Sequence, residues 1–228
     1  MDVLAPSDFF PVKPLDQCFL YTFVDTAYLH GRDPADVARA LCDGGSDLVQ
    51  LRAKGLSGVE VRRLAEALLP ITDRADVGLV INDHPGIAAE LGAPFCHLGQ
   101  EDFFDAGHTR RADLLPGGSV QLGLSSHAPA QAEQAVRAGA DYVAIGPVHA
   151  TPTKPGARPV TLDYVRWAAE HLTVPWFAIG GINLETVDAV LGAGARRICV
   201  VSAILNAPDI AMACQTFRER LSSVRNKL

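Results

Sequence analysis

Asp141-Tyr-Val-Ala-Ile-Gly-Pro-Val-His-Ala-Thr-Pro-Thr-Lys154 is an apolar run that ends abruptly in a loop rich in anion-binding groups. Residues 142–145 show no polar alternation, which is typical of a strand buried on both faces, as in a parallel sheet. A Gly-Pro pair ends the run, and beyond it stand Thr151, Thr153 and Lys154. Hydroxyls, backbone N–H groups and an ammonium are the donors that bind phosphate. Each of these residues alone is typical of an ordinary surface loop, but the cluster at a strand end predicts a phosphate site.

Similar apolar runs recur along the whole chain and alternate with helical segments. The eight predicted strands span residues 19–24, 48–52, 78–81, 95–98, 120–124, 141–145, 174–179 and 197–201. Helices are predicted between and after them at 34–42, 57–75, 87–91, 130–138, 162–171, 185–191 and 207–224. Residues 103–115 form a charged segment with no clear period. Eight alternating strands and helices predict an α/β fold of the (β/α)8 TIM barrel type.

A doubly wound open sheet is the alternative fold for this alternation. Its usual signature is a Gly-x-Gly-x-x-Gly turn after the first strand, and no such turn follows residues 19–24. We therefore favour the barrel. Because 228 residues suit a single barrel, we expect one domain over residues 18–228, preceded by a short N-terminal extension over residues 1–17.

The composition argues against several classes of protein. Hydrophobic residues make up 48% of the chain, and the formal net charge of -6 argues against a nucleic-acid surface. The five cysteines are scattered and include no Cys-x-x-Cys pair, which favours reduced, packed thiols over disulfides or zinc ligands. The first residues lack the long apolar run of a signal peptide, and no segment approaches the ~20 apolar residues of a membrane span. We expect a cytoplasmic protein that binds small molecules, neither nucleic acid nor membrane, and we leave a homo-oligomer open.

Polar side chains collect after the carboxyl ends of the predicted strands, where a barrel carries its catalytic face. They are Gln50, Arg52 and Lys54; Asn82 and Asp83; Gln100 and Asp102; Ser125, Ser126 and His127; Thr151, Thr153 and Lys154; Gly180 and Gly181; and Ser202. Two carboxylates, Asp83 and Asp102, among several cations suit a Mg2+ ion shared with a diphosphate, since Mg2+ takes one or two carboxylates plus phosphate oxygens. Either Asp could instead cap a helix.

Other reaction types fit these residues less well. Ser125-Ser126-His127 does not suggest a hydrolase, because neighbours along a strand point to opposite faces and the chain has no Gly-x-Ser-x-Gly elbow. The histidines lack the His-x-x-x-His spacing of a zinc site. A Schiff-base aldolase would need a lysine buried at the centre of a strand, whereas Lys54 and Lys154 follow strand ends.

Seven motifs, in order along residues 19–220, resemble those of the thiamine phosphate synthase family. They are Gln50-Leu-Arg-Ala-Lys54, Ile81-Asn-Asp83, His97-Leu-Gly-Gln-Glu-Asp102, Gly123-Leu-Ser-Ser-His127, Gly146-Pro-Val-His-Ala-Thr-Pro-Thr-Lys154, Ile179-Gly-Gly-Ile182 and Val200-Val-Ser-Ala-Ile204. The resemblance implies a (β/α)8 barrel that joins the diphosphate ester of hydroxymethylpyrimidine to a thiazole phosphate, giving thiamine phosphate and diphosphate. It implies a dissociative mechanism, in which diphosphate leaves before the thiazole nitrogen captures a pyrimidine-methyl cation.

The resemblance also implies roles for individual residues. The pyrimidine diphosphate would be held by Gln50, Arg52, Lys54, Asn82, Ser125 and Lys154, of which Arg52, Lys54, Ser125 and Lys154 are the expected catalytic residues. The cofactor Mg2+ would be held by Asp83 and Asp102. The thiazole phosphate would be held by Thr151, Thr153, Gly181, Val201 and Ser202.

The chain departs from the family pattern at two places. His149 stands where the family usually has an apolar aromatic residue, and Ala93-Pro94-Phe95 replaces a more usual Ala-Asp-Gly. Both departures bear on the fit of the substrate and leave the chemistry unchanged. Two other functions stay open: a thiazole tautomerase of the same barrel family, which would depend on His127, and a non-catalytic phosphate-binding barrel. A diphosphate site built from Arg52, Lys54, Lys154 and the two carboxylates favours the synthase, since an isomerase has no diphosphate to bind.

Overall fold

Eight parallel strands close into a barrel in the computed structural model, which describes residues 13–151, 156 and 158–225. Each strand is hydrogen-bonded to the next along the chain, and the last pairs with the first. The strands are β1 (Leu20–Asp25), β2 (Leu48–Arg52), β3 (Gly78–Asn82), β4 (Phe95–Leu98), β5 (Gln121–Ser126), β6 (Tyr142–Ile145), β7 (Trp176–Ile179) and β8 (Ile198–Cys199). The predicted (β/α)8 barrel is confirmed, and the open sheet is excluded by the β1–β8 pairing.

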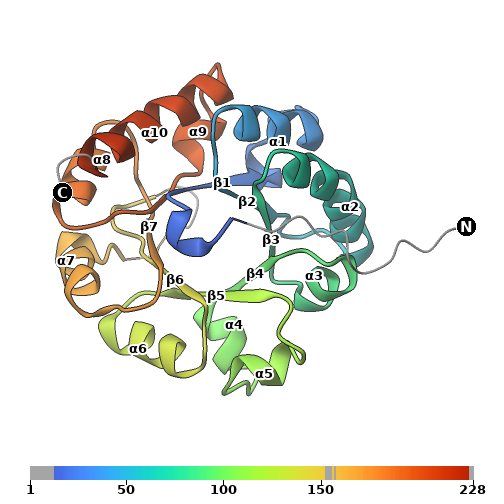
Figure 1. Cartoon of the computed structure of the whole chain (residues 1–228), viewed down its shortest axis with the longest axis horizontal. Helices are drawn as coiled ribbons and strands as arrows, with labels where there is room; N and C mark the ends of the chain where they lie inside the picture. The colour runs from blue at the N-terminus through green and yellow to red at the C-terminus, as the bar shows by residue number, and fades with distance from the viewer. Residues whose placement is uncertain (1–12, 152–155, 157, 226–228) are drawn as a thin grey trace, which may run out of the picture.

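Helices surround the strands as an outer ring (Figure 1). They are α1 (Pro34–Asp43), α2 (Gly58–Arg74), α3 (Pro85–Leu91), α4 (Gln100–Phe104), α5 (Arg111–Leu114), α6 (Pro129–Arg137), α7 (Thr161–His171), α8 (Val187–Gly192), α9 (Ser202–Leu205) and α10 (Ile210–Arg225), with the 3-10 turns η1 (Leu15–Gln17) and η2 (Thr26–Tyr28). Asp33 caps α1, since its side chain accepts from two backbone N–H groups. The capping box of Ser57 and Glu60 at the start of α2 also forms.

Three short helices were absent from the sequence prediction. The charged segment at 103–115 contains the end of α4 and all of α5, and α9 follows β8 directly, ahead of the helix predicted from residue 207. Each of the three has four or five residues, which is too short to show an apolar period. Among the helices in the described part of the chain, none combines the length and the apolar character needed to cross a bilayer.

The interior of the barrel is packed with aromatic side chains, and the two tyrosines among them also carry hydroxyl groups. The rings of Tyr21 and Tyr142 each meet Phe177 edge to face, with centroids 5.4 and 5.6 Å apart respectively. All three side chains are essentially fully buried. Such pairs contribute beyond the burial of their area, and they fill the inside of the barrel.

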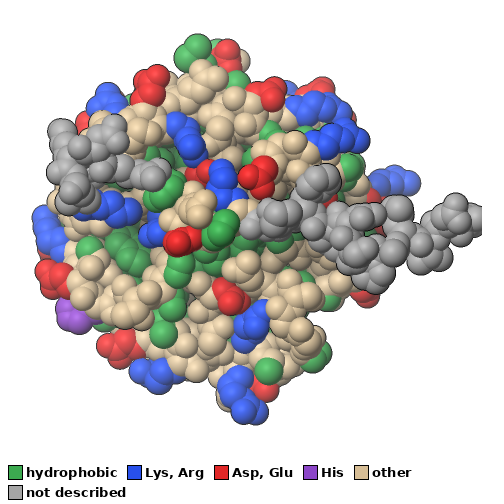
Figure 2. Space-filling model, in the orientation of Figure 1, with side chains coloured by type: hydrophobic (Ala, Val, Ile, Leu, Met, Phe, Trp, Pro, Cys, Tyr) green, Lys and Arg blue, Asp and Glu red, His purple; other side chains and the backbone are tan. Residues whose placement is uncertain are grey.

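The segment before β1 lies across the amino end of the barrel. In Figure 1 the dark-blue residues that include η1 cross the centre of the ring. Leu15 is buried there, and Lys13 forms an ion pair of 2.7 Å with Asp47, which precedes β2. Figure 2 shows acidic and basic side chains interspersed on the same face. Residues 13–17 therefore pack against the barrel, and the boundary predicted between residues 17 and 18 stays a prediction.

Candidate active site

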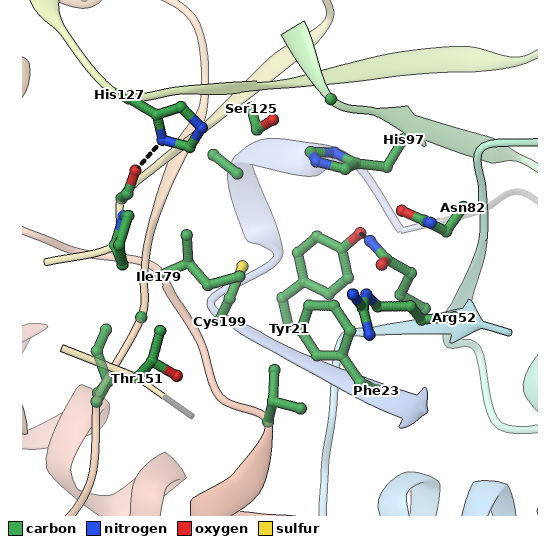
Figure 3. Close-up of a pocket in the computed structure, with 18 of the residues that line it drawn as sticks. Tyr21, Phe23, Arg52, Asn82, His97, Ser125, His127, Thr151, Ile179 and Cys199 are labelled. Carbon is green, nitrogen blue, oxygen red and sulfur yellow. Dashed lines mark hydrogen bonds between the residues drawn. The ribbon is translucent and has the colours of Figure 1, made fainter. Parts of the chain in front are cut away.

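A cavity of about 230 Å³ opens at the carboxyl ends of the strands. The predicted site residues in the described part of the chain all line it: Gln50, Arg52, Lys54, Asn82, Asp83, Asp102, Ser125, Thr151, Gly181, Val201 and Ser202. Thr153 and Lys154 lie outside the described residues. Residues far apart in the sequence thus face one space, as Figure 3 shows for Arg52, Asn82, Ser125 and Thr151. The structure shows where these side chains lie, and their roles in binding and catalysis stay predictions.

The alternation along β2 directs Gln50 and Arg52 to the same space, because alternate side chains of a strand point to one face. Lys54 reaches this space from the turn just after the strand. The same alternation separates the two serines at the end of β5. Ser125 faces the cavity, whereas the hydroxyl of Ser126 is buried, lies 2.6 Å from that of Tyr164 in α7 and donates to a backbone carbonyl. The expectation that Ser125 and Ser126 point to opposite faces of the strand agrees with this geometry.

Among the described residues, the lysine and arginine side chains that border the cavity are Arg52 and Lys54, and each is paired with a carboxylate. Arg52 donates from Nη1 to Oδ2 of Asp25 at 2.8 Å, and the side chain of Asp25 is only 1% exposed. Lys54 pairs with Asp83, and here the side chains are 55% and 23% exposed. Both cations keep donors that can meet an anion in the cavity, because an arginine has five N–H donors and a lysine three.

Asp83 is held at a sharp turn directly after β3. Its φ is 62°, a left-handed conformation that Asp tolerates better than most residues. Its backbone N–H donates to the carbonyl of His97 at 2.9 Å, and its carboxylate accepts from the amide of Asn82 at 2.7 Å. These bonds fix one carboxylate at the rim of the cavity beside Lys54.

Asp102 reaches the same cavity from the first turn of α4, and the absence of a side chain at Gly99 makes room for it. A Cβ atom at Gly99 would lie 2.6 Å from Oδ2 of Asp102, so a larger residue would displace the carboxylate. Within the described ranges, no three His, Cys, Asp or Glu side chains gather so as to hold a metal by themselves. Two carboxylates nevertheless fit Mg2+, which takes its remaining ligands from phosphate and water.

The floor of the cavity is aromatic and carries a chain of buried polar groups. The rings of Tyr21 and Phe23 stack at 5.2 Å with an interplanar angle of 4°. The amide of Gln50 donates to the hydroxyl of Tyr21 at 2.5 Å, and that hydroxyl lies 3.1 Å from the hydroxyl of Tyr142. The Tyr142 hydroxyl in turn lies 3.2 Å from Nδ1 of His97. Burial holds the pKa of both tyrosines well above the usual value, so both stay protonated at neutral pH.

His127 lies at the cavity with a defined orientation. Its Nδ1 donates to the backbone carbonyl of Gly146, which places the proton of a neutral imidazole on Nδ1 (Figure 3). Its Nε2 lies 3.9 Å from Oε1 of Glu101. Cys199 lines the same cavity, but burial holds the pKa of its thiol well above the usual value, so it is no thiolate nucleophile at neutral pH.

Two glycines after β7 let the β6 and β7 loops touch backbone to backbone. Gly180 has φ 99°, and a Cβ there would lie 2.4 Å from Cβ of Pro147. Gly181 has φ 62°, and a Cβ there would lie 2.6 Å from Cβ of His149. His149 thus packs behind Gly181, and its Nε2 is buried without a hydrogen-bond partner in the part of the chain that the structure describes.

The sequence prediction missed residues whose signal was present but ambiguous. Tyr21, Phe23 and Asp25 occupy alternate positions of β1, and the two aromatic residues line the cavity. Aromatic residues in an apolar run resemble ordinary core, and the predicted strand ended at Val24, one residue before Asp25. The Ala93-Pro94-Phe95 departure lies at the other end of β4, where Phe95 is buried 6.5 Å from the Tyr142 ring.

Comparison with known proteins assigns this geometry to a family. The family model described as thiamine monophosphate synthase matches residues 20–204. A thiamine-phosphate synthase of Thermus thermophilus is 49% identical over 82% of this chain and 87% of its own length. That of Acidothermus cellulolyticus is 43% identical over 90% and 95%. The solved structure of a thiamine phosphate pyrophosphorylase from Pyrococcus furiosus superposes with a TM-score of 0.82 at 26% identity, covering 93% of this chain and 99% of that one.

These matches favour one of the functions that the sequence left open. The two relatives named above are thiamine-phosphate synthases, and the cavity is lined by Arg52, Lys54, Asp83 and Asp102, which the synthase motifs contain. The chain therefore belongs to the thiamine monophosphate synthase family and is an enzyme of thiamine biosynthesis, a transferase that acts as a thiamine-phosphate synthase.

Proposed function

We propose that the cavity binds the pyrimidine diphosphate ester on the side of β2 and β3 and activates its diphosphate as a leaving group. The observation that carries this proposal is the meeting of Arg52, Lys54, Asp83 and Asp102 around one cavity. Arg52 and Lys54 bring positive charge to the place where the leaving group gains negative charge, and such electrostatic stabilisation is usually the largest single contribution to catalysis. Ser125, Asn82 and Gln50 add hydrogen bonds from neighbouring strands, and Lys154 is proposed to join them.

We propose that Asp83 and Asp102 hold a Mg2+ ion. Their hard oxygen ligands suit this ion, and a pair of carboxylates leaves most of its coordination for phosphate oxygens and water. When bound, the ion would supply charge neutralisation and orientation for the diphosphate. Asp83 already accepts from Asn82 and pairs with Lys54, so its carboxylate would be turned toward the cavity before any ion binds.

The opposite side of the cavity is proposed to bind the thiazole phosphate. Thr151, Gly181, Val201 and Ser202 line that side, after β6, β7 and β8. Barrels commonly bind phosphate after strands seven and eight, where backbone N–H groups and hydroxyls face the ligand. Thr153, which lies outside the described residues, is proposed to belong to the same group.

The proposed reaction is dissociative. The bond between the pyrimidine methylene carbon and the ester oxygen breaks, and its electron pair leaves with the diphosphate. The thiazole nitrogen then donates its lone pair to the methylene carbon and forms the new C–N bond. The stacked rings of Tyr21 and Phe23 offer an aromatic surface beside the cavity, and such surfaces favour a cationic species and exclude water that would compete for it.

The test follows diphosphate release from the purified enzyme with both substrates, in the presence and absence of Mg2+. We expect stoichiometric diphosphate and thiamine phosphate that depend on the ion. A pyrimidine diphosphate labelled with 18O at the ester oxygen should, without the thiazole, scramble the label into the other oxygens of recovered substrate. Full activity in EDTA would remove the metal proposal, and unscrambled label in the substrate recovered without the thiazole would remove the dissociative step.

The compartment is also a proposal. Cys18, Cys42, Cys96, Cys199 and Cys214 are all free thiols, and burial raises the pKa of Cys96 to about 12. Free thiols persist in reducing compartments, which supports the cytoplasm.

A further inference from the structure

Asp25 is a buried carboxylate directly behind the cavity. It is the last residue of β1, and the parallel register places it beside Arg52, the last residue of β2. Its side chain is 1% exposed, whereas that of Arg52 is 23% exposed and borders the cavity. Asp25 itself is not among the described residues that line the cavity. Asp25 therefore meets Arg52 and has no contact with a molecule in the cavity.

The two carboxylate oxygens have different partners. Oδ2 accepts from Nη1 of Arg52 at 2.8 Å, and Oδ1 accepts from the backbone N–H of Ala27 at 3.0 Å, which caps η2. The carboxylate is thereby fixed by the backbone on one side and holds the guanidinium on the other. Within the described residues, Asp25 is the one hydrogen-bond partner of the Arg52 side chain, so the remaining N–H groups of the guanidinium are available to the cavity.

We propose that Asp25 is a positioning residue, which holds the Arg52 guanidinium in the orientation that binds the diphosphate. This inference rests on the role proposed above for Arg52. An arginine side chain loses about 2 kcal/mol of rotamer entropy when it is fixed. A carboxylate that has already fixed one edge of the guanidinium removes most of that cost before the substrate arrives, which is preorganisation.

The neighbouring ion pair shows why burial matters here. Lys54 and Asp83 also pair, but their side chains are 55% and 23% exposed. Exposed pairs contribute little and exchange partners readily, because solvent screens them. Asp83 can therefore leave Lys54 for another cation, whereas Asp25, with both oxygens engaged and solvent excluded, stays with Arg52.

A purely structural role for Asp25 is the competing explanation, since an N-cap contributes about 1 kcal/mol of stability. Two substitutions separate the roles. Asp25→Ser keeps an oxygen that can cap Ala27 and removes the acceptor for Arg52. Asp25→Asn leaves one amide oxygen for two donors. Asp33→Asn is the matched control, because Asp33 caps α1 in the same way at an exposed position.

The experiment is a double-mutant cycle on kcat/KM with the wild type, Asp25→Ser, Arg52→Ala and the double variant. We expect Asp25→Ser and Asp25→Asn each to lower kcat/KM about 10–100-fold, as misplacement of a catalytic group does. In the Arg52→Ala background the same changes should cost less than about twofold, because contacting residues that act as a unit are not additive. Asp33→Asn should leave kcat/KM unchanged.

Each outcome decides between the explanations. Equal losses from Asp25→Ser in both backgrounds, or a fall in melting temperature with unchanged kcat/KM, would mean that Asp25 is only a cap. Full activity of Arg52→Ala would overturn the role proposed for Arg52, and the positioning role with it. A low kcat/KM of Arg52→Ala together with an additive Asp25→Ser effect would overturn the positioning role alone. Circular dichroism of each variant checks that the barrel is folded.

Discussion

The two ends of the barrel use carboxylates in opposite ways. At the amino end, Asp47 is 1% exposed and accepts from Lys13, Arg218 and the backbone N–H groups of Phe19 and Leu20, at 2.7 to 3.0 Å. At the carboxyl end, Asp83 is 23% exposed, pairs with the half-exposed Lys54 and keeps acceptor capacity.

The difference lies in how completely the protein itself satisfies each carboxylate. Asp47 joins the segment before β1, β1 and α10, and its acceptor sites are used by groups of the chain. A buried charge that is fully hydrogen-bonded contributes to a single native structure, because removing its partners leaves groups without bonds. The carboxylate of Asp83 has fewer hydrogen-bond partners within the described residues, so a ligand can still bind to it. The comparison therefore contrasts a carboxylate that stabilises the fold with one that is proposed to take part in the chemistry.

Substitution of Asp47 is the largest expected effect. Asp47→Ala leaves two backbone N–H groups without an acceptor, one of them on the fully buried Leu20, which costs about 3 kcal/mol in total. The melting temperature should fall by roughly 6–12 °C, while kcat of the folded enzyme stays within about twofold. Thermal denaturation and steady-state kinetics measure both. Asp43→Ala, at an exposed position on α1, is the control and should shift the melting temperature by about 2 °C or less.

The opposite pattern is expected for the carboxylates of the cavity. Asp83→Asn or Asp102→Asn should lower kcat about a hundredfold or more, because transition-state electrostatics are lost. The melting temperature should move by about 2 °C or less, because Asp102 is exposed and solvent screens the pair of Asp83 with the half-exposed Lys54. Asp163→Asn on α7 is the exposed control. Wild-type kcat in both variants would mean that the two carboxylates only cap turns.

The fold was largely predictable from the sequence because buried parallel strands are continuous apolar runs. The predicted limits of the strands at 48–52 and 95–98 agree with β2 and β4, and each of the others differs from the structure by one or two residues at one end or both. The strand predicted at 197–201 is the least accurate, because only Ile198 and Cys199 pair as β8. The missing helices α4, α5 and α9 have too few residues for a period to appear.

The candidate site was predictable only where polar residues interrupt apolar runs. Gln50 and Arg52 stand out from their strand, so the alternation could be followed. The inward direction of Tyr21 and Phe23 could not be predicted, because both faces of a barrel strand are apolar. The sequence of such a strand does not show which residues point into the barrel. The contact between Asp25 and Arg52 could not be predicted either, because it depends on the pairing register of β1 and β2. The sequence of a single strand does not contain that register.

Ligand binding at the carboxyl end should also stabilise the barrel, and this gives a third test of the contrast between the two ends. Diphosphate with Mg2+, each at about a hundred times its dissociation constant, should contribute roughly 2.7 kcal/mol and raise the melting temperature by roughly 5–10 °C. Neither alone should match this rise, since the anion without metal meets Asp83 and Asp102, and the metal without anion lacks ligands. The synergy should vanish in Asp83→Ala and persist in Asp47→Asn. An equal shift from sulfate would indicate a generic anion site.

The pH dependence of the Asp47 cluster is the smallest expected effect. Burial alone would raise the pKa of Asp47, but the hydrogen bonds from Lys13, Leu20 and Phe19 and the charge of Arg218 outweigh it, and the net effect lowers the pKa. A carboxyl group whose pKa is lower in the folded state stabilises the fold above its unfolded pKa, about 3.9, and loses that contribution as the pH falls toward the folded value.

Lys13→Met tests this dependence, because it keeps the bulk of the stem and removes the charge. Lys13 is 27% exposed, so the loss should be about 1 kcal/mol or less, which corresponds to roughly 2–4 °C at pH 7. The difference in melting temperature between the wild type and Lys13→Met should stay constant from pH 7 to 5 and shrink below about pH 4, where Asp47 begins to protonate in the unfolded chain. Lys13→Arg keeps the charge and should follow the wild type. A difference that persists unchanged to pH 3 would show that Lys13 stabilises the amino end through packing of its stem, and the contrast between the two ends would then rest on Arg218 and the backbone N–H groups alone.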